Sequence, residues 1–387
     1  MGAINSVRRL TIQTISLLEA LEPTPMETAL KQQATVAMER LVQHKWPHLR
    51  LHAFGSSQNG FGGGSSDLDV GLFFDDPAEL AALSWNDRIQ ILASVASILT
   101  HNGVLELEQF VYSARVPLLK FWDRRRKIAI DMSVGSPMAL QNTRLLKAYG
   151  QLDARVRPLV FAVKHWAKQR RINDASNGSL SSYAWIMLVI FFLQTRPAPV
   201  LPVLSVDAPE IGAALESSPP DAVGALLAGF FQFYAWDFDY KSNVVSIRLG
   251  AALPKVGKWG LGLGTWRFSI EDPIDLQHDV ARVVFHCKGQ ARLLGELRRA
   301  AAMTLGAECT LDTICELVEE QRCFICDSLA HAPRDCPDMW LPTTTDTTPP
   351  RLPAPAKPVL TKTLDNKKRP RRRTRSKSTP KKKMMLI

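Results

Sequence analysis

Asp67 and Asp69 stand one residue apart at the end of the stretch FGSSQNGFGGGSSDLD, residues 54–69. Alternate residues of a β-strand share a face, so these two carboxylates are expected to point the same way. Neighbouring carboxylates repel each other unless a cation joins them, and hard oxygen ligands suit Mg²⁺ or Mn²⁺. Upstream, Gly55 and Ser56 could offer backbone N–H groups and a hydroxyl to a phosphate. A metal site beside a phosphate site suggests nucleotidyl transfer, whereas the alternative is a solvated, glycine-rich surface loop.

A third candidate carboxylate lies in KIAIDMSV, residues 127–134. Apolar side chains alternate along this stretch, so they share one face of the expected strand and Asp131 lies on the other. If this strand joins the sheet that carries Asp67 and Asp69, the three carboxylates could hold two metal ions. Such a pair of ions activates an attacking oxygen and steadies a leaving one. The alternative is an exposed strand aspartate without a partner ion.

Two lysines could bind the phosphates of a nucleotide. Lys164 and Lys168 are spaced i,i+4 in an expected helix over residues 155–171, so they share one helical face. The pair could bind β- and γ-phosphates if that face looks onto the metal site. Otherwise it is an ordinary solvated face.

A cysteine and histidine cluster follows near the C-terminal end of the globular sequence. The spacing C-x₂-C-x₄-H-x₄-C is formed by Cys323, Cys326, His331 and Cys336. Three thiolates and one imidazole at these spacings fit a tetrahedral Zn²⁺ closed on all sides, which is typical of a structural site. Phe324 within the cluster and Trp340 after it could stack on unpaired bases.

The hydrophobic pattern predicts the elements that must position these residues. Helices are expected over residues 7–22, 26–44, 87–100, 155–171, 181–194 and 276–302. Strands are expected over residues 49–54, 67–74, 115–122 and 127–134. Gly, Ala and Pro dominate residues 196–230, which are expected to form a loop region.

The chain has 387 residues, of which 46% are hydrophobic and 22% charged, so it has room for two domains and a sizeable core. Its net charge of +11 equals the eleven Lys and Arg of residues 367–383, a segment without acids. The body is therefore neutral, and a negative partner meets the basic tail first. This tail could be a nuclear import signal read by import receptors, or an RNA tether. The segment 341–387 is expected to be disordered, because its Pro/Thr-rich start cannot bury a core.

The cysteines and the N-terminus bear on the compartment. All six cysteines lie between Cys287 and Cys336, and the start MGAINSVRRL has no apolar signal-peptide core. A secreted disulfide framework would spread its cysteines and need such a signal. The longest apolar run, residues 185–193, is too short to span a membrane. We expect a nuclear or cytoplasmic protein that is not secreted, has no membrane span and is monomeric.

Taken together, these motifs resemble the noncanonical nucleotidyltransferases of the DNA polymerase β-like superfamily, the poly(A)/poly(U) polymerases. The likeness runs from about residue 49 to residue 336 and is greatest to terminal uridylyltransferases with a CCHC zinc knuckle. It is carried by GS with DLD, by IAIDMSV, by LQNTRLLKAYGQLDARVRPLVFAVKHWAKQRRI (residues 140–172), by LSSY and by FFQFYAWDFDYKSNVVSIR (residues 230–248).

The resemblance implies an α+β fold with two lobes and a nucleotide between them. A small mixed α/β catalytic lobe would span residues 46–143. A mainly helical, poly(A)-polymerase-associated lobe would span residues 144–320, with the helices of residues 1–45 packed on it. A zinc knuckle would follow at residues 321–340.

The resemblance also implies roles for nucleotide-binding residues. The Asn-Thr pair, Asn142 and Thr143, would contact the ribose. Lys164 and Lys168 would bind the triphosphate. In LSSY, Ser182 would touch phosphate and the ring of Tyr183 would stack on the base.

The motif IEDPIDLQH, residues 270–278, bears on base choice. In uridylyltransferases the acids matching Asp272 and Asp275 help read the uracil edge. The histidine matching His278 crowds out adenine and favours UTP. The family's usual Asn after this histidine is replaced by Asp279, whose added negative charge bears on nucleotide preference.

The implied reaction adds UMP from UTP to RNA 3′ ends and releases pyrophosphate. Asp67 and Asp69 would hold both Mg²⁺ or Mn²⁺ ions. Asp131 would help to hold the ion that lowers the pKa of the RNA 3′-OH, and could take its proton. The alternatives are a poly(A) RNA polymerase of the same fold and a non-enzymatic RNA-binding adaptor that uses the knuckle and the tail.

Overall fold

The structure is a computed structural model that describes residues 2–101, 103, 105–112, 116–209, 222–259, 266–319 and 322–340. The Pro/Thr-rich segment and the basic tail, with the disorder, import signal and RNA tether expected of them, lie outside these residues, as does the side chain of Trp340. No helix of the described part is long and apolar enough to cross a membrane.

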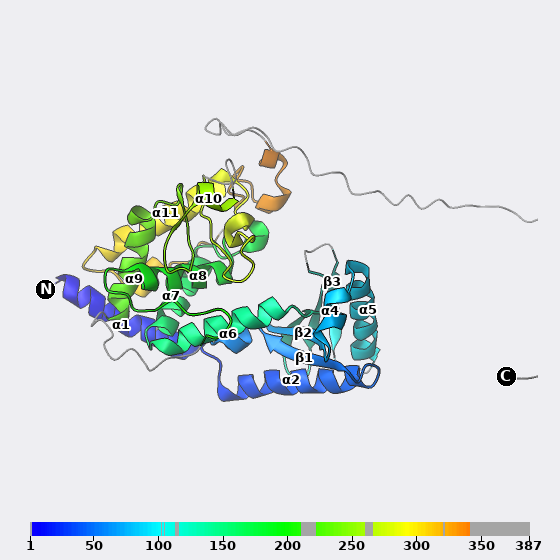
Figure 1. Cartoon of the computed structure of the whole chain (residues 1–387). Helices are drawn as coiled ribbons and strands as arrows, with labels where there is room; N and C mark the ends of the chain where they lie inside the picture. The colour runs from blue at the N-terminus through cyan, green and yellow to red at the C-terminus, as the bar shows by residue number, and fades with distance from the viewer. Residues whose placement is uncertain are drawn as a thin grey trace, which may run out of the picture. The chain divides into compact units, whose positions relative to one another are not determined.

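A five-stranded mixed sheet forms one half of the molecule (Figure 1). Its strands are β1 (Leu49–Phe54), β2 (Leu68–Phe74), β3 (Glu106–Val111), β4 (Leu118–Asp123) and β5 (Ile128–Val134). Their order is β1-β2-β5-β4-β3, and only the β2–β5 pair is parallel within this sheet. Strand β3 has no counterpart among the strands expected from the sequence, and Asp67 lies one residue before β2. The parallel pairing brings the motif after the glycine-rich loop beside IAIDMSV.

The apolar side chains of the alternating strands pack under two helices, α2 (Pro25–Gln43) and α5 (Trp85–His101). Met38 and Val42 of α2 and Leu92 of α5 are fully buried there. The sequence led us to expect both N-terminal helices on the helical lobe. The structure instead divides them, because the apolar stripe of α2 covers the sheet core whereas α1 (Gly2–Leu21) packs against α7 (Val156–Gln169) and α9 (Val223–Gln232). The short α4 (Pro77–Ala82) joins β2 to α5.

A single helix, α6 (Pro137–Leu152), leads from the sheet into the helical half (Figure 1). Leu140 packs against the core of the sheet. Leu145 and Leu146, little more than one turn later, belong to the core of the helical half. The change from one hydrophobic core to the other therefore falls inside one continuous helix.

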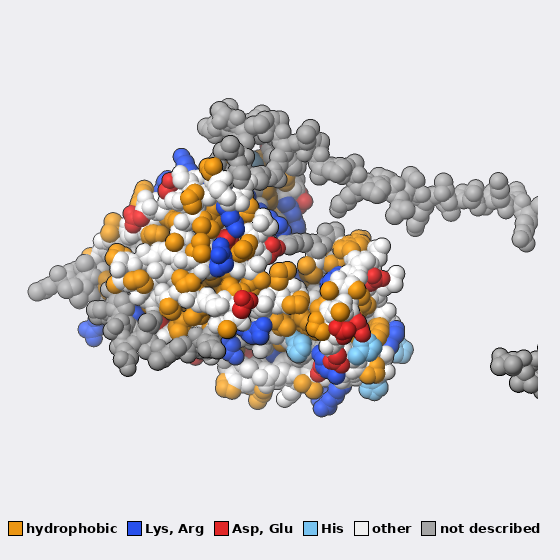
Figure 2. Space-filling model, in the orientation of Figure 1, with side chains coloured by type: hydrophobic (Ala, Val, Ile, Leu, Met, Phe, Trp, Pro, Cys, Tyr) orange, Lys and Arg blue, Asp and Glu red, His pale blue; other side chains and the backbone are white. Residues whose placement is uncertain are grey.

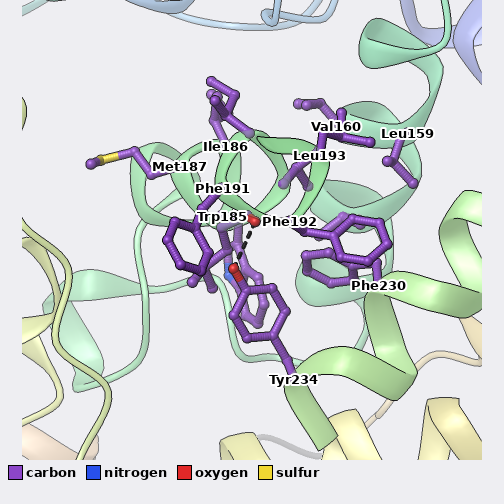
Figure 3. Close-up of a cluster of buried hydrophobic side chains, with 14 of the residues drawn as sticks. Leu159, Val160, Trp185, Ile186, Met187, Phe191, Phe192, Leu193, Phe230 and Tyr234 are labelled. Carbon is purple, nitrogen blue, oxygen red and sulfur yellow. Dashed lines mark hydrogen bonds between the residues drawn. The ribbon is translucent and has the colours of Figure 1, made fainter. Parts of the chain in front are cut away.

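The helical half is built around α7 (Val156–Gln169) and α8 (Ser182–Thr195). In its core (Figure 3) the rings of Phe230 and Tyr234 lie with their centroids 5.0 Å apart, and the Tyr234 hydroxyl donates to the carbonyl of Leu188 at 2.8 Å. Helix α9 (Val223–Gln232) begins inside the segment expected to be loop. Helix α11 (Cys287–Thr304) begins eleven residues later than the pattern from residue 276 predicts.

Short elements complete the described part. They are α3 (Ser56–Asn59), α10 (Lys255–Trp259), α12 (Leu311–Ile314), the strands β6 (Asn243–Val244) and β7 (Leu253–Pro254), and the helical turns Ala175–Asn177, Phe233–Asp237, Val280–Val283, Pro333–Asp335 and Pro337–Trp340.

Candidate active site

The turn after β1 is shaped by a glycine. Gly55 has φ of 66°, and a Cβ added there would lie 2.4 Å from Oδ2 of Asp69. Only glycine allows the turn to pass this close to the carboxylate. The backbone N–H of Gly55 donates to the Thr143 hydroxyl at 2.9 Å, and that hydroxyl donates to the carbonyl of Ala139 at 2.7 Å. The Thr143 hydroxyl is therefore already engaged in fixing the turn to α6.

The three candidate carboxylates lie together. Asp69 of β2 is the register partner of Asp131 in β5, and Asp67 precedes β2. Burial, followed by the charges of Asp131 and Asp67, raises the pKa of Asp69 to about 7, although the backbone N–H of Ser56 acts in the opposite direction. Burial and the charge of Asp131 also raise the pKa of Asp67. The group is thus short of positive charge, as a cation site is before its cation binds.

Two lysines that sequence reasoning missed stand beside these acids. Lys120 of β4 is the register partner of Asp131, and its Nζ donates to both carboxylate oxygens at 2.8 and 3.0 Å. Lys31 of α2 is buried, and its Nζ donates to the Ser66 hydroxyl at 3.0 Å. A signal for Lys120 existed, because it lies on the polar face of a strand whose alternate residues, Leu119 and Phe121, are fully buried.

Lys168 meets the condition set by the sequence, since its charge acts on Asp67 and partly opposes the rise in the pKa of that carboxyl, which burial and Asp131 cause. Lys164, one turn earlier, donates from Nζ to the carbonyl of Phe61. Burial and then the charge of Lys168 lower the pKa of Lys164 to about 8. Phe61 is itself fully buried in the core of the helical half, so the glycine-rich loop is anchored beside the lysine pair.

Tyr183 and Ser182 open α8, and both are held by neighbours. The single proton of the Tyr183 hydroxyl is shared between two acceptors, Oδ1 of Asn142 at 2.8 Å and Oδ2 of Asp272 at 3.2 Å. Burial and the charge of Asp272 raise the pKa of Tyr183 well above its ordinary value. The Ser182 hydroxyl accepts from the side-chain amide of Asn173 at 3.0 Å. These contacts bring α6, α8 and the Asp272 loop to one place.

The loop from Asp272 to His278 closes on itself. Oδ1 of Asp272 accepts the N–H groups of Ile274 and Asp275, each at 3.0 Å, and Nδ1 of His278 lies 3.8 Å from Oδ2 of Asp272. The N–H of His278 donates to the carbonyl of Asp275 at 2.8 Å. Burial acts to raise the pKa of Asp272, but His278 and the two backbone donors outweigh it and lower that pKa. The Asp272 carboxylate is therefore largely satisfied by the protein itself.

The added acid after His278 is also compensated. Asp279 accepts the N–H groups of Ala281 at 2.9 Å and Ile270 at 3.0 Å, and its carboxylate pairs with Arg267 at 3.0 Å. The Asp279 side chain thus caps the N-terminus of the turn Val280–Val283. The Asp279 carboxylate is therefore already engaged within the protein, which argues against the effect on nucleotide preference that the sequence suggested.

The cysteine and histidine cluster comes together as its spacing predicts. The ligand atoms of Cys323, Cys326, His331 and Cys336 all lie within 4.8 Å of one another. This cluster is compatible with a zinc site. We call residues 322–340, which contain it, the Cys/His module.

The base-stacking role considered for Phe324 does not fit its surroundings. Its ring lies 6.4 Å from that of Phe285 and 6.5 Å from that of His286, centroid to centroid. A Cβ added to Gly178 or to Gly289 would lie 3.1 or 3.2 Å from the Phe324 ring. The ring therefore packs the Cys/His module against the helical half.

Comparisons with known proteins agree with this geometry. The family described as "Poly(A) RNA polymerase, mitochondrial-like, central palm domain" matches residues 10–151. The "Cid1 family poly A polymerase" family matches residues 222–278. The chain belongs to the noncanonical poly(A)/poly(U) polymerase family. As a member of this family it also shares the two-lobed fold of the Cid1 poly(U) polymerase crystal structure, with a TM-score of 0.70, 26% identity, and coverage of 80% of this chain and 98% of that one.

Curated relatives in this noncanonical polymerase family carry different names. Poly(A) RNA polymerase GLD2-A of Xenopus laevis is 33% identical over 298 residues, which is 72% of this chain and 56% of that protein. Terminal uridylyltransferase 7 of Homo sapiens is 34% identical over 291 residues, which is 69% of this chain and 19% of that protein. The chain thus spans little more than half the length of the GLD2-A relative.

Proposed function

We propose that this protein adds nucleotides from a nucleoside triphosphate to the 3′ end of RNA. The observation that carries the proposal is the group of three carboxylates at the neighbouring inner strands β2 and β5, with Lys168 of the helical half close enough to act on Asp67. The names of its relatives, poly(A) RNA polymerase and terminal uridylyltransferase, support an RNA substrate.

The donor set of the three carboxylates fits hard divalent cations. All three ligands offer oxygen, and the pKa values of Asp67 and Asp69 are raised by burial and then by the negative charge of the neighbouring carboxylates. We propose that Asp67, Asp69 and Asp131 hold Mg²⁺ or Mn²⁺. Such ions, when bound, lower the pKa of a 3′-hydroxyl and neutralise charge on the phosphates. We propose likewise that the Cys/His module holds a structural Zn²⁺.

In this proposal the rest of the site positions the nucleotide. Lys164 and Lys168 bind the β- and γ-phosphates, with Ser182 and the N–H groups of the Gly55–Ser56 turn as further donors. The RNA 3′-oxygen attacks the α-phosphorus, its proton passes to Asp131, and the bond to the leaving pyrophosphate breaks in line.

Other residues of the site take more limited roles. Asn142 contacts the ribose. We assign Thr143 a positioning role, because its hydroxyl is engaged with Gly55 and Ala139. The ring of Tyr183 stacks on the base, while its hydroxyl ties the base site to α6.

For the nucleotide we propose UTP. His278 lies near the Asp272 carboxylate with its side chain 24% exposed, and we assign it to the edge of the proposed base site. An imidazole there would reduce the room for a purine, and in this proposal Asp275 beside it reads the uracil edge. The second candidate is ATP, which is supported by the relatives named poly(A) RNA polymerase.

The experiment is extension of a labelled RNA primer by the purified full chain with Mg²⁺ and each of the four nucleotides in turn. The proposal predicts extension with UTP in preference to ATP. Better extension with ATP would overturn the choice of UTP and leave the transferase proposal intact. Failure with all four nucleotides would overturn the transferase proposal itself.

A non-enzymatic RNA-binding adaptor is the contrasting hypothesis. The Asp67→Ala variant separates the two, because it removes a proposed metal ligand and leaves the Cys/His module unchanged. We expect it to bind RNA as the wild type does and to lose extension. Extension at the wild-type rate would contradict the assignment of Asp67.

A further inference from the structure

The glycine-rich loop that leads into Asp67 is held at its beginning by α7. Arg157 of that helix donates to the carbonyl of Gly60 at 3.1 Å, and Lys164 donates to the carbonyl of Phe61. Both contacts tie the start of the loop to the helical half. Asp67, however, stands at the other end of the loop, next to the sheet.

Lys31 of α2 anchors this other end. Its Nζ donates to the Ser66 hydroxyl at 3.0 Å and reaches the carbonyl of Gly64 at 3.5 Å. Ser66 directly precedes Asp67 in the chain, and its N–H donates to the carbonyl of Gly63 at 3.0 Å. The hydrogen bond from Lys31 to Ser66 therefore restrains the backbone from which the Asp67 carboxylate extends.

The loop packs closely against its surroundings at this point. A Cβ added to Gly62 would lie 2.9 Å from the Ser66 hydroxyl oxygen. A Cβ added to Gly64 would lie 2.6 Å from a carboxylate oxygen of Glu27, near the start of α2. The N–H of Gly64 donates to the carbonyl of Leu21, where α1 ends, at 3.0 Å. Glycines thus let the loop lie against the corner between the two N-terminal helices.

The burial of Lys31 is unusual for a lysine. On the face drawn in Figure 2, blue and red side chains are interspersed at the surface, as is ordinary for charged residues. Only 7% of Lys31 is exposed. Burial lowers its pKa, and the charges of Glu27, Asp67 and Asp69 oppose that effect. Because burying an ammonium costs free energy, keeping one beside two proposed metal ligands suggests a role at that site.

We propose that Lys31 is a positioning residue for the cation site, which acts through Ser66 to hold the Asp67 carboxylate where a divalent cation binds. The helix that carries it is fixed to the core of the sheet through Met38 and Val42, so the anchor is rigid. Groups that orient a metal ligand raise metal affinity without touching the metal.

A purely electrostatic role for Lys31 makes the opposite prediction. If the lysine only contributed its charge, its removal would take away a repulsion and strengthen cation binding. If it positions Asp67, its removal weakens cation binding even though a positive charge is lost. The direction of the change therefore separates the two roles.

The proposal rests on the proposed function for the identity of the cation site, but its test does not need catalysis. The Kd for Mn²⁺ of the purified full chain is measured by electron paramagnetic resonance of the free ion, without RNA or nucleotide. The variants are Lys31→Met, Ser66→Ala and the two combined. Lys45→Met is the matched control, since it removes one charge from an exposed lysine just after α2.

We expect Lys31→Met and Ser66→Ala each to raise the Kd for Mn²⁺ about tenfold. The double variant should raise it no further, because both substitutions remove the same contact. Lys45→Met should leave the Kd unchanged. If the buried Lys31→Met does not fold, as its melting curve would reveal, Ser66→Ala decides alone, because it keeps the lysine and its charge.

Three results would overturn the proposal. They are a lower Kd in Lys31→Met, a Kd in Ser66→Ala equal to that of the Lys45→Met control, and full additivity of the two effects in the double variant.

The same data keep this proposal apart from the proposed function. The expected losses of Mn²⁺ affinity in a protein that extends no primer would sustain the positioning role and remove the transferase proposal. Unchanged Mn²⁺ affinity in variants of an active transferase would do the reverse. A wild type that binds no Mn²⁺ would remove the cation site on which both rest.

Discussion

The molecule holds two groups of acids, and they are built in opposite ways. On the sheet, burial and mutual repulsion raise the pKa values of Asp67 and Asp69. In the Asp272 loop, Glu271 and Asp272 are less accessible to solvent than either of these, yet their pKa values are lowered. Arginine, lysine, histidine and backbone donors surround the second group, whereas Lys120 and Lys31 only partly balance the first. The difference indicates that the protein itself neutralises the loop acids, whereas the sheet acids need bound cations. We call Glu271 and Asp272, with the groups that pair with them, the finished frame.

The contributions of the two groups to folding stability should change with pH in opposite directions. The folded-state pKa of Asp69, about 7, lies above its ordinary value of 3.8. Without cations its stabilising contribution is therefore present below about pH 4 and is lost as pH rises toward 7. The pKa values of Glu271 and Asp272 are lowered, so these carboxylates stabilise the fold at pH values above their ordinary pKa. This stabilisation is lost as the pH falls.

The largest effect is expected from Asp69→Asn. Removing one of the clustered carboxylates should lower the extension rate on the order of 10³-fold, because cation binding carries several kcal/mol of transition-state stabilisation. Single-turnover extension of an RNA primer measures this. The matched control is Asp75→Asn, an exposed partner of Arg50 at 3.1 Å, which should extend normally. Equal rates for the two variants would break the contrast between the sheet acids and ordinary surface acids.

For Glu271 of the finished frame, we expect a substitution to act mainly on the free energy of unfolding. Glu271 is fully buried and accepts from Lys258 at 2.6 Å, Ser246 at 2.6 Å and Arg248 at 3.1 Å. Glu271→Gln should lower the free energy of unfolding by about 3 kcal/mol, because two cations lose their counter-charge. Urea unfolding measures it, and Asp75→Asn should cost about 1 kcal/mol or less. A change as small as that of Asp75→Asn would show that stability does not depend on the interactions of Glu271.

The edge of the frame should set the choice of base. His278→Asn should lower the preference for UTP over ATP by about tenfold, because a shorter side chain admits the larger purine. Competition between the two labelled nucleotides measures the ratio. An unchanged ratio would mean that base choice is made elsewhere in the site.

The smallest expected effect concerns pH. Lys164 has its pKa lowered to about 8, so its positive charge is present below that pH and is lost above it. The kcat/KM for the nucleotide should therefore fall about threefold between about pH 7.5 and 8.5. Lys164→Arg keeps its charge over this range and provides the control. A parallel fall in both proteins would assign the titration to another group.

Much of the sheet group could be predicted from sequence. The alternation of IAIDMSV places Asp131 opposite four apolar side chains, and the structure buries these while leaving Asp131 half-exposed. The spacing of Lys164 and Lys168 also gave their common face. Such patterns are local, so a single sequence contains them.

Contacts between distant segments could not be predicted in this way. The apolar pattern of α2 alone does not indicate whether this helix packs against the sheet or against the helical half. The bond from Gly55 to Thr143 joins residues far apart in the chain, and so does the pair of Lys120 with Asp131. Glu271 gave no signal of its own, because its partners Arg248 and Lys258 meet it only in the folded chain.

The central claim is that the sheet acids are completed by cations, and one measurement tests it directly. The melting temperature of the full chain is determined at about pH 8 with and without Mg²⁺, for the wild type and for Asp69→Asn. At this pH Asp69 is mostly ionised, so the account predicts that Mg²⁺ raises the melting temperature of the wild type and has little effect on the variant. The same rise in both proteins would contradict it.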